Sequence, residues 1–251
     1  MKLAVAGGTG TVGSHVVDVA RSRGHEVVVL SRSEGVDLVT GEGVDSALRD
    51  VSAVVDVTSI GTQSAEASIA FFSAVTRTLL ASPVPHLVSL SIVGIDGSEY
   101  GYYQGKQAQE RELAAAEGGF TLLRATQFHE FAPQIAGQFS FGPLTLAPTM
   151  RTQPIAAREV ATRLVDLAEG SPQGRVADLA GPREENLAEM IRGYLRVTGR
   201  RGPVLQLSLP GAGFVAMRSG SLLPPVGADL GTQTYAEWLA TASYQRPSGT
   251  H

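Results

Sequence analysis

The chain has 251 residues, no cysteine and a formal net charge of −4 at pH 7. Without cysteine it forms no disulfide, thiol nucleophile or thiolate metal site, and its acidic balance with no lysine or arginine run argues against a nucleic-acid partner. Hydrophobic residues make up 43% of the sequence, enough for a sizeable core. No apolar segment reaches the length of a membrane span or a signal peptide, so we expect a cytoplasmic protein.

The opening segment, residues 2–13 with the sequence KLAVAGGTGTVG, combines an apolar run with closely spaced glycines. The run is typical of a parallel strand buried on both faces, and a helix is expected over 14–23. Glycines between strand and helix let the backbone approach a pyrophosphate, which the N–H groups of the helix N-terminus then hold. The spacing G-x-x-G-x-x-G differs from the commoner G-x-G-x-x-G, and a plain tight turn is the alternative. The residues predicted to bind a cofactor here are Gly7, Thr9, Gly10, Thr11, Val12 and Gly13.

A second strand is expected over residues 26–30, which completes a βαβ unit of about thirty residues. Dinucleotide-binding folds that choose NAD usually place Asp or Glu at the end of this strand. Here the sequence has Ser31, Arg32 and Ser33. Because an arginine can pair with the 2′-phosphate of the cofactor, these residues predict binding of NADP(H) in preference to NAD(H). The nearby Glu34 leaves NAD as an alternative cofactor. The other alternative is that Arg32 is a solvated side chain at the end of a strand.

The pattern of hydrophobic residues predicts several further strands and helices. An apolar strand is expected over residues 53–58. It would end at the edge where ligands bind in parallel sheets, so Thr58 and Ser59 are expected beside the cofactor. The other elements expected before residue 100 are a short strand within 35–40, a short helix over 45–50, a helix over 64–81 and a strand over 86–93.

Tyr102 and Lys106 lie four residues apart at the start of the next expected helix, so their side chains share one helix face. Only two residues of the chain are lysines, which makes a chance Tyr-x-x-x-Lys spacing rare. An ammonium group near a phenol lowers the pKa of the tyrosine and makes proton transfer feasible near neutral pH, and a lysine can also hold a ribose hydroxyl. The pair predicts a proton-transfer site, with two surface side chains as the alternative.

The GGTGTVG turn, the strand ending in Ser31 and Arg32, and the YYQGK segment together resemble the short-chain dehydrogenase/reductase superfamily. The chain looks most like its atypical, NmrA-like NAD(P)H-binding branch, and the resemblance covers nearly the whole sequence. It implies an α/β, Rossmann-type doubly wound parallel sheet with a small C-terminal substrate-binding annex. It also implies that Tyr102 is the general acid/base and that Lys106 is its electrostatic partner and binds the nicotinamide ribose.

In this family a serine at the end of the 86–93 strand hydrogen-bonds the substrate carbonyl, and here the sequence departs from the pattern. Ile92 aligns with the catalytic serine, whereas Ser91 can take its place after a shift of one residue. Strand alternation puts Ser89 on the same side, deeper in the sheet. Ser91 is therefore the third catalytic candidate.

A strand is expected over residues 120–126, and the resemblance implies that its end and the following loop pass the nicotinamide. Thr126 is assigned to the cofactor on this basis. His129 is either an auxiliary proton donor or a hydrogen-bond partner of the substrate, with ordinary packing as the alternative. The residues assigned to the substrate pocket are Gln127, Phe128, His129 and Met150. The five histidines show no metal-ligand spacing, so no metal site is predicted.

Two regions are expected, a dinucleotide-binding Rossmann core over residues 1–130 and a substrate-binding or lid region over 131–251. The second region is interwoven with the last strands and helices of the core. Its expected helices cover residues 157–169, 184–197, 213–219 and 235–240, its expected strands cover 175–179 and 204–209, and the last nine residues are expected to be frayed.

These features predict an NADPH-dependent oxidoreductase that acts on a small organic carbonyl or conjugated ketone, as a monomer or homodimer. The hydride would come from the nicotinamide and the proton from Tyr102. One alternative is a non-catalytic NADP(H)-binding redox sensor that regulates another protein. A second alternative keeps the fold but carries out a non-redox isomerisation or cyclisation, because fold alone does not decide function.

Overall fold

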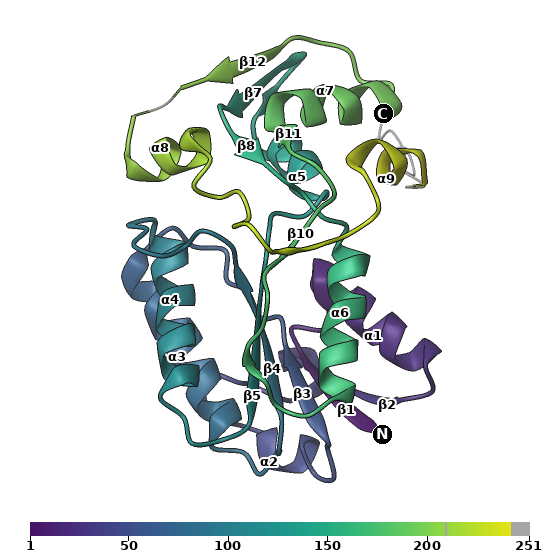
Figure 1. Ribbon diagram of the computed structural model, residues 1–251, viewed down its shortest axis with the longest axis vertical. Coiled ribbons are helices and arrows are strands. Elements are labelled where there is room, and N and C mark those ends of the chain that lie inside the picture. The colour runs from purple at the N-terminus through teal and green to yellow at the C-terminus, as the bar shows by residue number, and fades with distance from the viewer. Residues whose placement is uncertain (209, 242–251) are drawn as a thin grey trace. The chain divides into compact units, whose positions relative to one another are not determined.

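The computed structural model describes residues 1–208 and 210–241 (Figure 1). The chain divides into two compact units, and each is described by itself. The first unit comprises Met1–Ala125 and Ala157–Leu179, and the second comprises Thr126–Ala156 and the described residues from Ala180 onward. The last nine residues, expected to be frayed, and Leu209, the end of an expected strand, lie outside the described residues.

A parallel sheet forms the centre of the first unit. Its main strands, in spatial order, are β2 (Glu26–Leu30), β1 (Lys2–Ala6), β3 (Ala53–Asp56), β4 (Leu87–Ile92) and β5 (Phe120–Ala125). Beyond β5 lie the short strands β9 (Gly174–Arg175) and β10 (Leu179–Ala180), which replace the single strand expected over 175–179. Because β2 and β3 lie on either side of β1, the sheet is doubly wound and Rossmann-type, as predicted.

Four long helices cover the sheet. Helix α1 (Thr11–Ser22) packs on α6 (Ala157–Glu169), and α3 (Ala65–Leu80) packs on α4 (Gly101–Ala114). Figure 1 shows the two pairs on opposite faces of the sheet. The strands are therefore enclosed on both sides, which explains their continuous apolar sequence. Helix α3 begins where the Ser64 side chain accepts a hydrogen bond from the Ala67 N–H. The short helix α2 covers Val44–Ala47.

The short strand expected within residues 35–40 is wrong. Gly35 has a φ of +75°, and the segment continues as turns. A carboxylate oxygen of Asp37 accepts hydrogen bonds from the backbone N–H groups of Val39 at 2.8 Å and Thr40 at 3.2 Å. These donors are engaged by a side chain and bend the chain locally, so they cannot join a strand ladder.

The second unit is built of shorter elements. Strands β12 (Val204–Leu207), β7 (Leu144–Pro148) and β6 (Ser140–Phe141) form one sheet, and β8 (Arg151–Thr152) pairs antiparallel with β11 (Glu185–Asn186). The helices are α5 (Phe131–Gln138), α7 (Leu187–Val197), α8 (Ala212–Ser219) and α9 (Tyr235–Thr241). The short strand β13 (Asp229–Leu230) lies beside β10.

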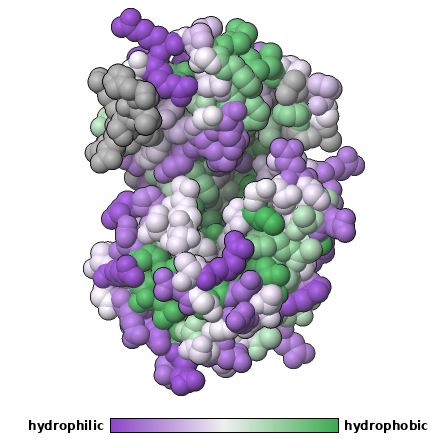
Figure 2. Space-filling model, turned by 180° about the vertical axis from the view of Figure 1, so that it is seen from behind, coloured by the Kyte–Doolittle hydropathy of each residue, from purple (hydrophilic) through white to green (hydrophobic). Residues whose placement is uncertain are grey.

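The surface carries hydrophobic side chains in several places between polar ones (Figure 2). Within residues 1–208 and 210–241, no helix combines the length and the apolar character that crossing a lipid bilayer requires.

Candidate functional site

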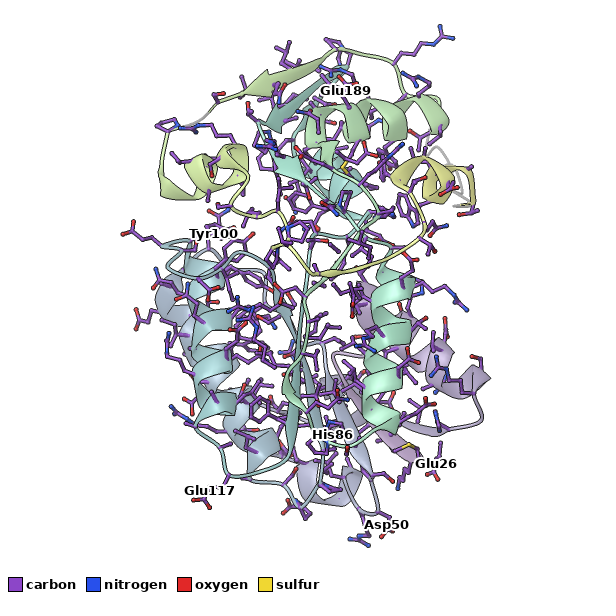
Figure 3. All side chains as sticks on the ribbon, in the orientation of Figure 1. Glu26, Asp50, His86, Tyr100, Glu117 and Glu189 are labelled. Carbon is purple, nitrogen blue, oxygen red and sulfur yellow. The ribbon has the colours of Figure 1, made fainter. Side chains whose placement is uncertain are left out.

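The candidate site lies at the carboxyl edge of the parallel sheet in the first unit, where ligands bind in doubly wound folds. Figure 3 shows Tyr100 at this end of the unit, whereas Glu26, Asp50, His86 and Glu117 mark the opposite end. The glycine turn follows β1 at this edge, the segment with Thr58 and Ser59 follows β3, and helix α4 begins close to Tyr100.

The glycine turn is tight because side chains are absent from it. Gly7 has a φ of +79°, and its carbonyl oxygen accepts a hydrogen bond from the Gly10 N–H at 3.0 Å. A Cβ atom on Gly13 would lie 2.1 Å from that same oxygen. Gly10 precedes α1 without a side-chain cap, so no capping side chain engages the N–H groups of the first helical turn. This cradle fits the pyrophosphate of a dinucleotide.

Arg32 lies at the end of β2, in the short 3₁₀ turn Arg32–Glu34, and its side chain is exposed. The hydroxyls of Ser31 and Ser33 lie 2.9 Å apart beside it. The guanidinium group is thus available to an anion at the strand end. Glu34 is exposed on the same turn, so a negatively charged side chain shares this turn with the guanidinium group that would receive the anion.

Tyr102 is held at the first turn of α4. Its hydroxyl lies 2.9 Å from the hydroxyl of Ser59, and its ring meets the ring of Phe72 edge-on. Burial raises the pKa of Tyr102, the hydrogen bond to Ser59 opposes that rise, and the charge of Asp56 adds to it. The expected lowering of the tyrosine pKa is therefore wrong for this structure, because burial and a carboxylate dominate the surroundings of the phenol.

Lys106 is buried in the interior of the first unit. Its ammonium group donates hydrogen bonds to the Leu90 carbonyl oxygen at 3.0 Å and to Oε1 of Gln109 at 2.9 Å. It also lies 4.3 Å from the centroid of the Phe72 ring, a cation–π contact. Burial lowers the pKa of Lys106 to about 8, against the opposing charges of Asp56 and Glu110. Lys106 and Tyr102 thus contact the same phenyl ring.

Asp56 and Gln109 complete a buried polar chain that sequence reasoning missed. Nε2 of Gln109 donates to Oδ2 of Asp56 at 2.7 Å, and Oδ1 of Asp56 accepts from the N–H of Thr58 at 3.0 Å and from its hydroxyl at 2.7 Å. The chain therefore runs from Lys106 through Gln109 to Asp56 and Thr58. The available signal was the aspartate within an apolar strand, because a buried carboxylate requires polar partners.

The end of β3 explains why Lys106 lies where it does. Strand β3 ends at Asp56, which is paired with Ser89, whereas β4 continues to Ile92. Leu90 is the next residue of β4, and its carbonyl oxygen is the one that accepts from Lys106. The ammonium group thus satisfies a backbone oxygen at the point where the two strands separate.

Ser91 lies in β4 opposite Arg124 of β5 and is 2% exposed. Within the described part of the chain, its hydroxyl and that of Ser89 have no hydrogen-bond partner. No hydrogen bond there joins Ser91 to Tyr102 or Lys106. The Ser91 hydroxyl therefore has an unused hydrogen-bond donor and acceptor near the sheet edge. Leaving such a buried group without a partner costs free energy.

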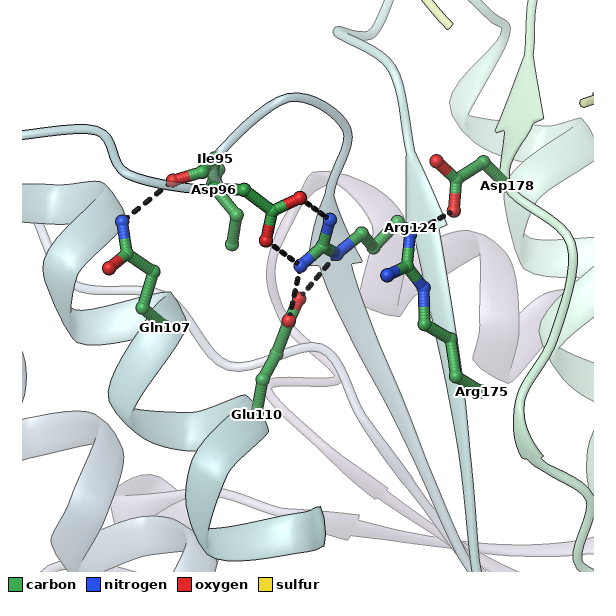
Figure 4. A network of polar contacts seen from close by, with 7 residues as sticks. All are labelled: Ile95, Asp96, Gln107, Glu110, Arg124, Arg175 and Asp178. Carbon is green, nitrogen blue, oxygen red and sulfur yellow. Dashed lines mark hydrogen bonds and ion pairs between the residues drawn. The ribbon is translucent and has the colours of Figure 1, made fainter. Parts of the chain in front are cut away.

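Arg124 anchors the loop that leads from β4 into α4 (Figure 4). Its guanidinium group binds both carboxylate oxygens of Asp96 at 2.6 and 2.7 Å and both of Glu110, a residue of α4, at 2.8 and 2.6 Å. Gln107, also in α4, donates to the carbonyl oxygen of Ile95 at 2.6 Å. Arg124 lowers the pKa of Asp96. These contacts fix the backbone that presents Tyr102.

The residues assigned to the cofactor and substrate after β5 belong to the second unit. The Thr126 hydroxyl donates to the Gln153 carbonyl oxygen at 2.6 Å, and Oε1 of Gln127 accepts from the Thr152 hydroxyl at 2.9 Å. Phe128 pairs as a single bridge with Ile155. These contacts organise the segment locally, and its cofactor and substrate roles stay predictions.

His129 and Met150 are enclosed within the second unit, at 0% and 1% exposure. Nε2 of His129 lies 3.0 Å from the Gln233 carbonyl oxygen, and its ring lies beside the rings of Tyr235 and Trp238 of α9. Both residues therefore contribute to packing here. In residues 1–208 and 210–241, no three His, Asp or Glu side chains gather in a way that could hold a metal ion.

The glycine turn, β2 and β3 fall within residues 3–77, which match the sequence model of the NAD dependent epimerase/dehydratase family. Over these residues the match agrees with the superfamily resemblance that the sequence predicts. Among curated proteins, no sequence matches the chain.

Several solved structures share the fold over almost the whole chain. The NADPH-dependent quinone oxidoreductase QOR2 from Escherichia coli, complexed with NADPH, is 18% identical with a TM-score of 0.70, and the match covers 95% of this chain and 98% of that one. MoeE5 in complex with UDP-glucuronic acid and NAD is 16% identical with a TM-score of 0.71, covering 96% and 97%. Triphenylmethane reductase from Citrobacter sp. is 14% identical with a TM-score of 0.67, covering 90% and 92%. This chain therefore shares the fold of these proteins over almost its whole length.

Proposed function

We propose that the protein is an NADPH-dependent oxidoreductase that reduces a small organic carbonyl or conjugated ketone. The observation that carries this proposal is the Tyr102 hydroxyl, held 2.9 Å from Ser59 at the sheet edge that also carries the glycine turn. A phenol that is fixed beside a dinucleotide-binding turn is suited to proton transfer. Two of the similar structures, QOR2 and triphenylmethane reductase, are named as NADPH-dependent or NADP(H)-bound reductases.

The first unit supplies the nucleotide contacts. The backbone of Gly7, Gly10 and Gly13 would hold the pyrophosphate, and the exposed Arg32 would pair with the 2′-phosphate that distinguishes NADPH from NADH. The bound cofactor supplies the hydride. Glu34 repels a 2′-phosphate, so the preference for NADPH depends on Arg32.

Tyr102 would donate the proton to the substrate oxygen. Because burial raises its pKa, the phenol stays protonated at neutral pH and starts the reaction as an acid. The Ser59 hydroxyl would then donate a hydrogen bond to the phenolate until solvent returns the proton. The Lys106 ammonium group contacts the same Phe72 ring that the Tyr102 ring meets edge-on.

The test is to mix the purified protein with NADPH and a simple quinone and to follow oxidation of the cofactor. We expect the wild-type protein to oxidise NADPH only with the quinone present. Tyr102→Phe should lose turnover and keep its affinity for NADPH, measured by the change in NADPH fluorescence. Turnover that is unchanged in Tyr102→Phe would refute the role of the phenol.

A non-catalytic NADP(H) sensor is the second candidate, and one observation favours it. The Lys106 ammonium group is occupied by Leu90 and Gln109 in the protein interior, so it is not presented to a ribose. NADPH binding without turnover of any carbonyl, together with a protein partner recovered with only one redox form, would support this function. Product formation without net NADPH consumption would instead indicate an isomerase or cyclase.

A further inference from the structure

Four arginines surround a pocket on the surface of the second unit. Arg192 and Arg196 lie one turn apart on α7, and Arg200 and Arg201 follow the helix. With Leu195, Gly199, Gly202 and Val204 they line a pocket of about 510 Å³. Nothing in the proposed reaction uses these residues, since the glycine turn, Tyr102 and Lys106 all belong to the first unit.

The end of α7 explains why the arginines converge. Gly199 has a φ of +71°, its N–H donates to the Arg196 carbonyl oxygen at 3.2 Å, and the Arg200 N–H donates to the Leu195 carbonyl oxygen at 2.9 Å. This pair of bonds is a Schellman motif, which reverses the chain. The reversal brings Arg200 and Arg201 back beside the last turn of the helix. Arg192 adds a contact to β12, because its guanidinium group donates to the Val204 carbonyl oxygen at 2.9 Å.

Capping the helix does not require these side chains. The two backbone hydrogen bonds of the Schellman motif satisfy two of the last carbonyl oxygens of the helix. The Thr198 hydroxyl donates to the carbonyl oxygens of Tyr194 at 3.0 Å and Leu195 at 3.2 Å. Like α1, α3 and α4, helix α7 carries a single basic residue in its last turn, Arg196, and the other three arginines of the pocket lie outside that turn. The arginine pocket therefore holds more positive charge than the dipole of α7 accounts for.

The charge of the pocket is mostly uncompensated. Arg192 pairs with Glu189 at 2.5 Å. Across the described residues, Arg196, Arg200 and Arg201 have no ion pair with a carboxylate, and all three are exposed. This local excess of three positive charges occurs in a chain whose net charge is −4. Arg192 and Arg196 carry like charges at positions i and i+4 of α7, so an anion in the pocket would offset their repulsion.

We propose that the arginine pocket binds a small molecule that carries two or more phosphate groups. Guanidinium groups form paired hydrogen bonds with phosphate oxygens, and several of them around one cavity match several phosphates. The volume falls within the range of about 300–1,000 Å³ that is usual for small-molecule sites and exceeds the needs of a single phosphate ion. A diphosphate is the smallest ligand that meets both conditions. This site is independent of the nucleotide site in the first unit.

The experiment is calorimetric titration of the full chain with inorganic pyrophosphate, and in parallel with ADP. The test variant is Arg196→Gln/Arg200→Gln. The matched control is Arg151→Gln/Arg183→Gln, which removes two exposed arginines of the same unit that pair with Glu184 and Glu185. Far-UV circular dichroism checks that all variants are folded, and NADPH binding is measured in each.

We expect the dissociation constant of pyrophosphate to rise by about tenfold or more in the test variant and to stay unchanged in the control. NADPH affinity should be the same in all three proteins. If ADP loses more affinity than pyrophosphate on this substitution, the ligand is a nucleotide, and equal losses indicate that the diphosphate alone is recognised. Equal pyrophosphate affinity in the wild type and the test variant, or no binding at millimolar pyrophosphate, would overturn the proposal.

Discussion

The hydroxyl groups of Tyr102 and Ser59 lie 2.9 Å apart, and this contact joins the first turn of α4 to the segment that follows β3. These residues are far apart in the sequence, and the sheet edge brings them together. The position of the phenol is thus set by Ser59, by the Phe72 ring and by the loop that Arg124 anchors. Lys106 shares the Phe72 contact but faces the protein interior.

Replacing Tyr102 with Phe should remove the proton donor and leave the fold intact. We expect turnover with NADPH and a quinone to fall by roughly a hundredfold or more, because general acid catalysis contributes at least that much. Tyr100→Phe is the matched control, since Tyr100 is the N-cap residue of α4 and its ring packs on Tyr103. Equal turnover in the two variants would show that the phenol of Tyr102 has no chemical role.

The buried Lys106 should make stability depend on pH. Its pKa is about 8 in the folded protein, below its usual 10.5, so between these pH values the unfolded chain holds a proton that the folded chain has released. Stability therefore rises with pH across this window, by an amount on the order of 3 kcal/mol. Urea unfolding from pH 7.5 to 10.5 measures it. Lys106→Met should lack this rise, and parallel curves for both proteins would contradict the account.

Asp56 should be important for stability because it is the negative charge that faces Lys106 through Gln109. In Asp56→Asn the amide retains an oxygen for Thr58 but loses the charge, so we expect a loss of about 2 kcal/mol in the free energy of unfolding. Asp50→Asn is the control, since Asp50 is exposed at the opposite end of the unit (Figure 3). Similar unfolding midpoints in urea for both variants would argue against a stabilising polar chain.

Gly13 should tolerate no side chain. Its Cβ would lie 2.1 Å from the Gly7 carbonyl oxygen, whereas a Cβ on Gly10 would approach the same oxygen only to 3.3 Å. We expect Gly13→Ala to displace the start of α1, to lower the melting temperature and to abolish NADPH binding. Gly10→Ala should melt close to the wild type. A Gly13→Ala protein that binds NADPH normally would show that the turn does not hold the cofactor.

Arg32 should determine the choice between the two cofactors. Loss of a charge-assisted pair with the 2′-phosphate in Arg32→Gln should weaken NADPH binding by about tenfold and leave NADH binding unchanged. Fluorescence titrations with each cofactor provide the comparison. Equal affinities of the wild-type protein for NADH and NADPH would remove the basis for the proposed preference.

The sequence predicted the parallel sheet of the first unit well, because the strands of this sheet are apolar runs with turn residues at their ends. The strand expected over residues 26–30 forms with those bounds, and the doubly wound sheet is confirmed. The strand within 35–40 failed because one Asp37 carboxylate captures two backbone donors, which overrides local apolar pattern.

The candidate site was predicted only in part, because its connections are tertiary. The spacing of Tyr102 and Lys106 placed both on one helix, but it did not show that Lys106 turns inward to Leu90 and Gln109. The link between Gln109 and Asp56 spans 53 positions, so no local pattern reveals it. His129 stood out as a polar residue after a strand, whereas the structure encloses it among aromatic rings.

The most direct test of the central claim is a crystal structure with NADP⁺ bound, in which the distance from the Tyr102 hydroxyl to C4 of the nicotinamide is measured. We predict a distance within about 5 Å, which leaves room for a reacting carbonyl between them. A phenol that points away from the nicotinamide, or a nicotinamide ring without a fixed position, would contradict a reductase and favour the sensor.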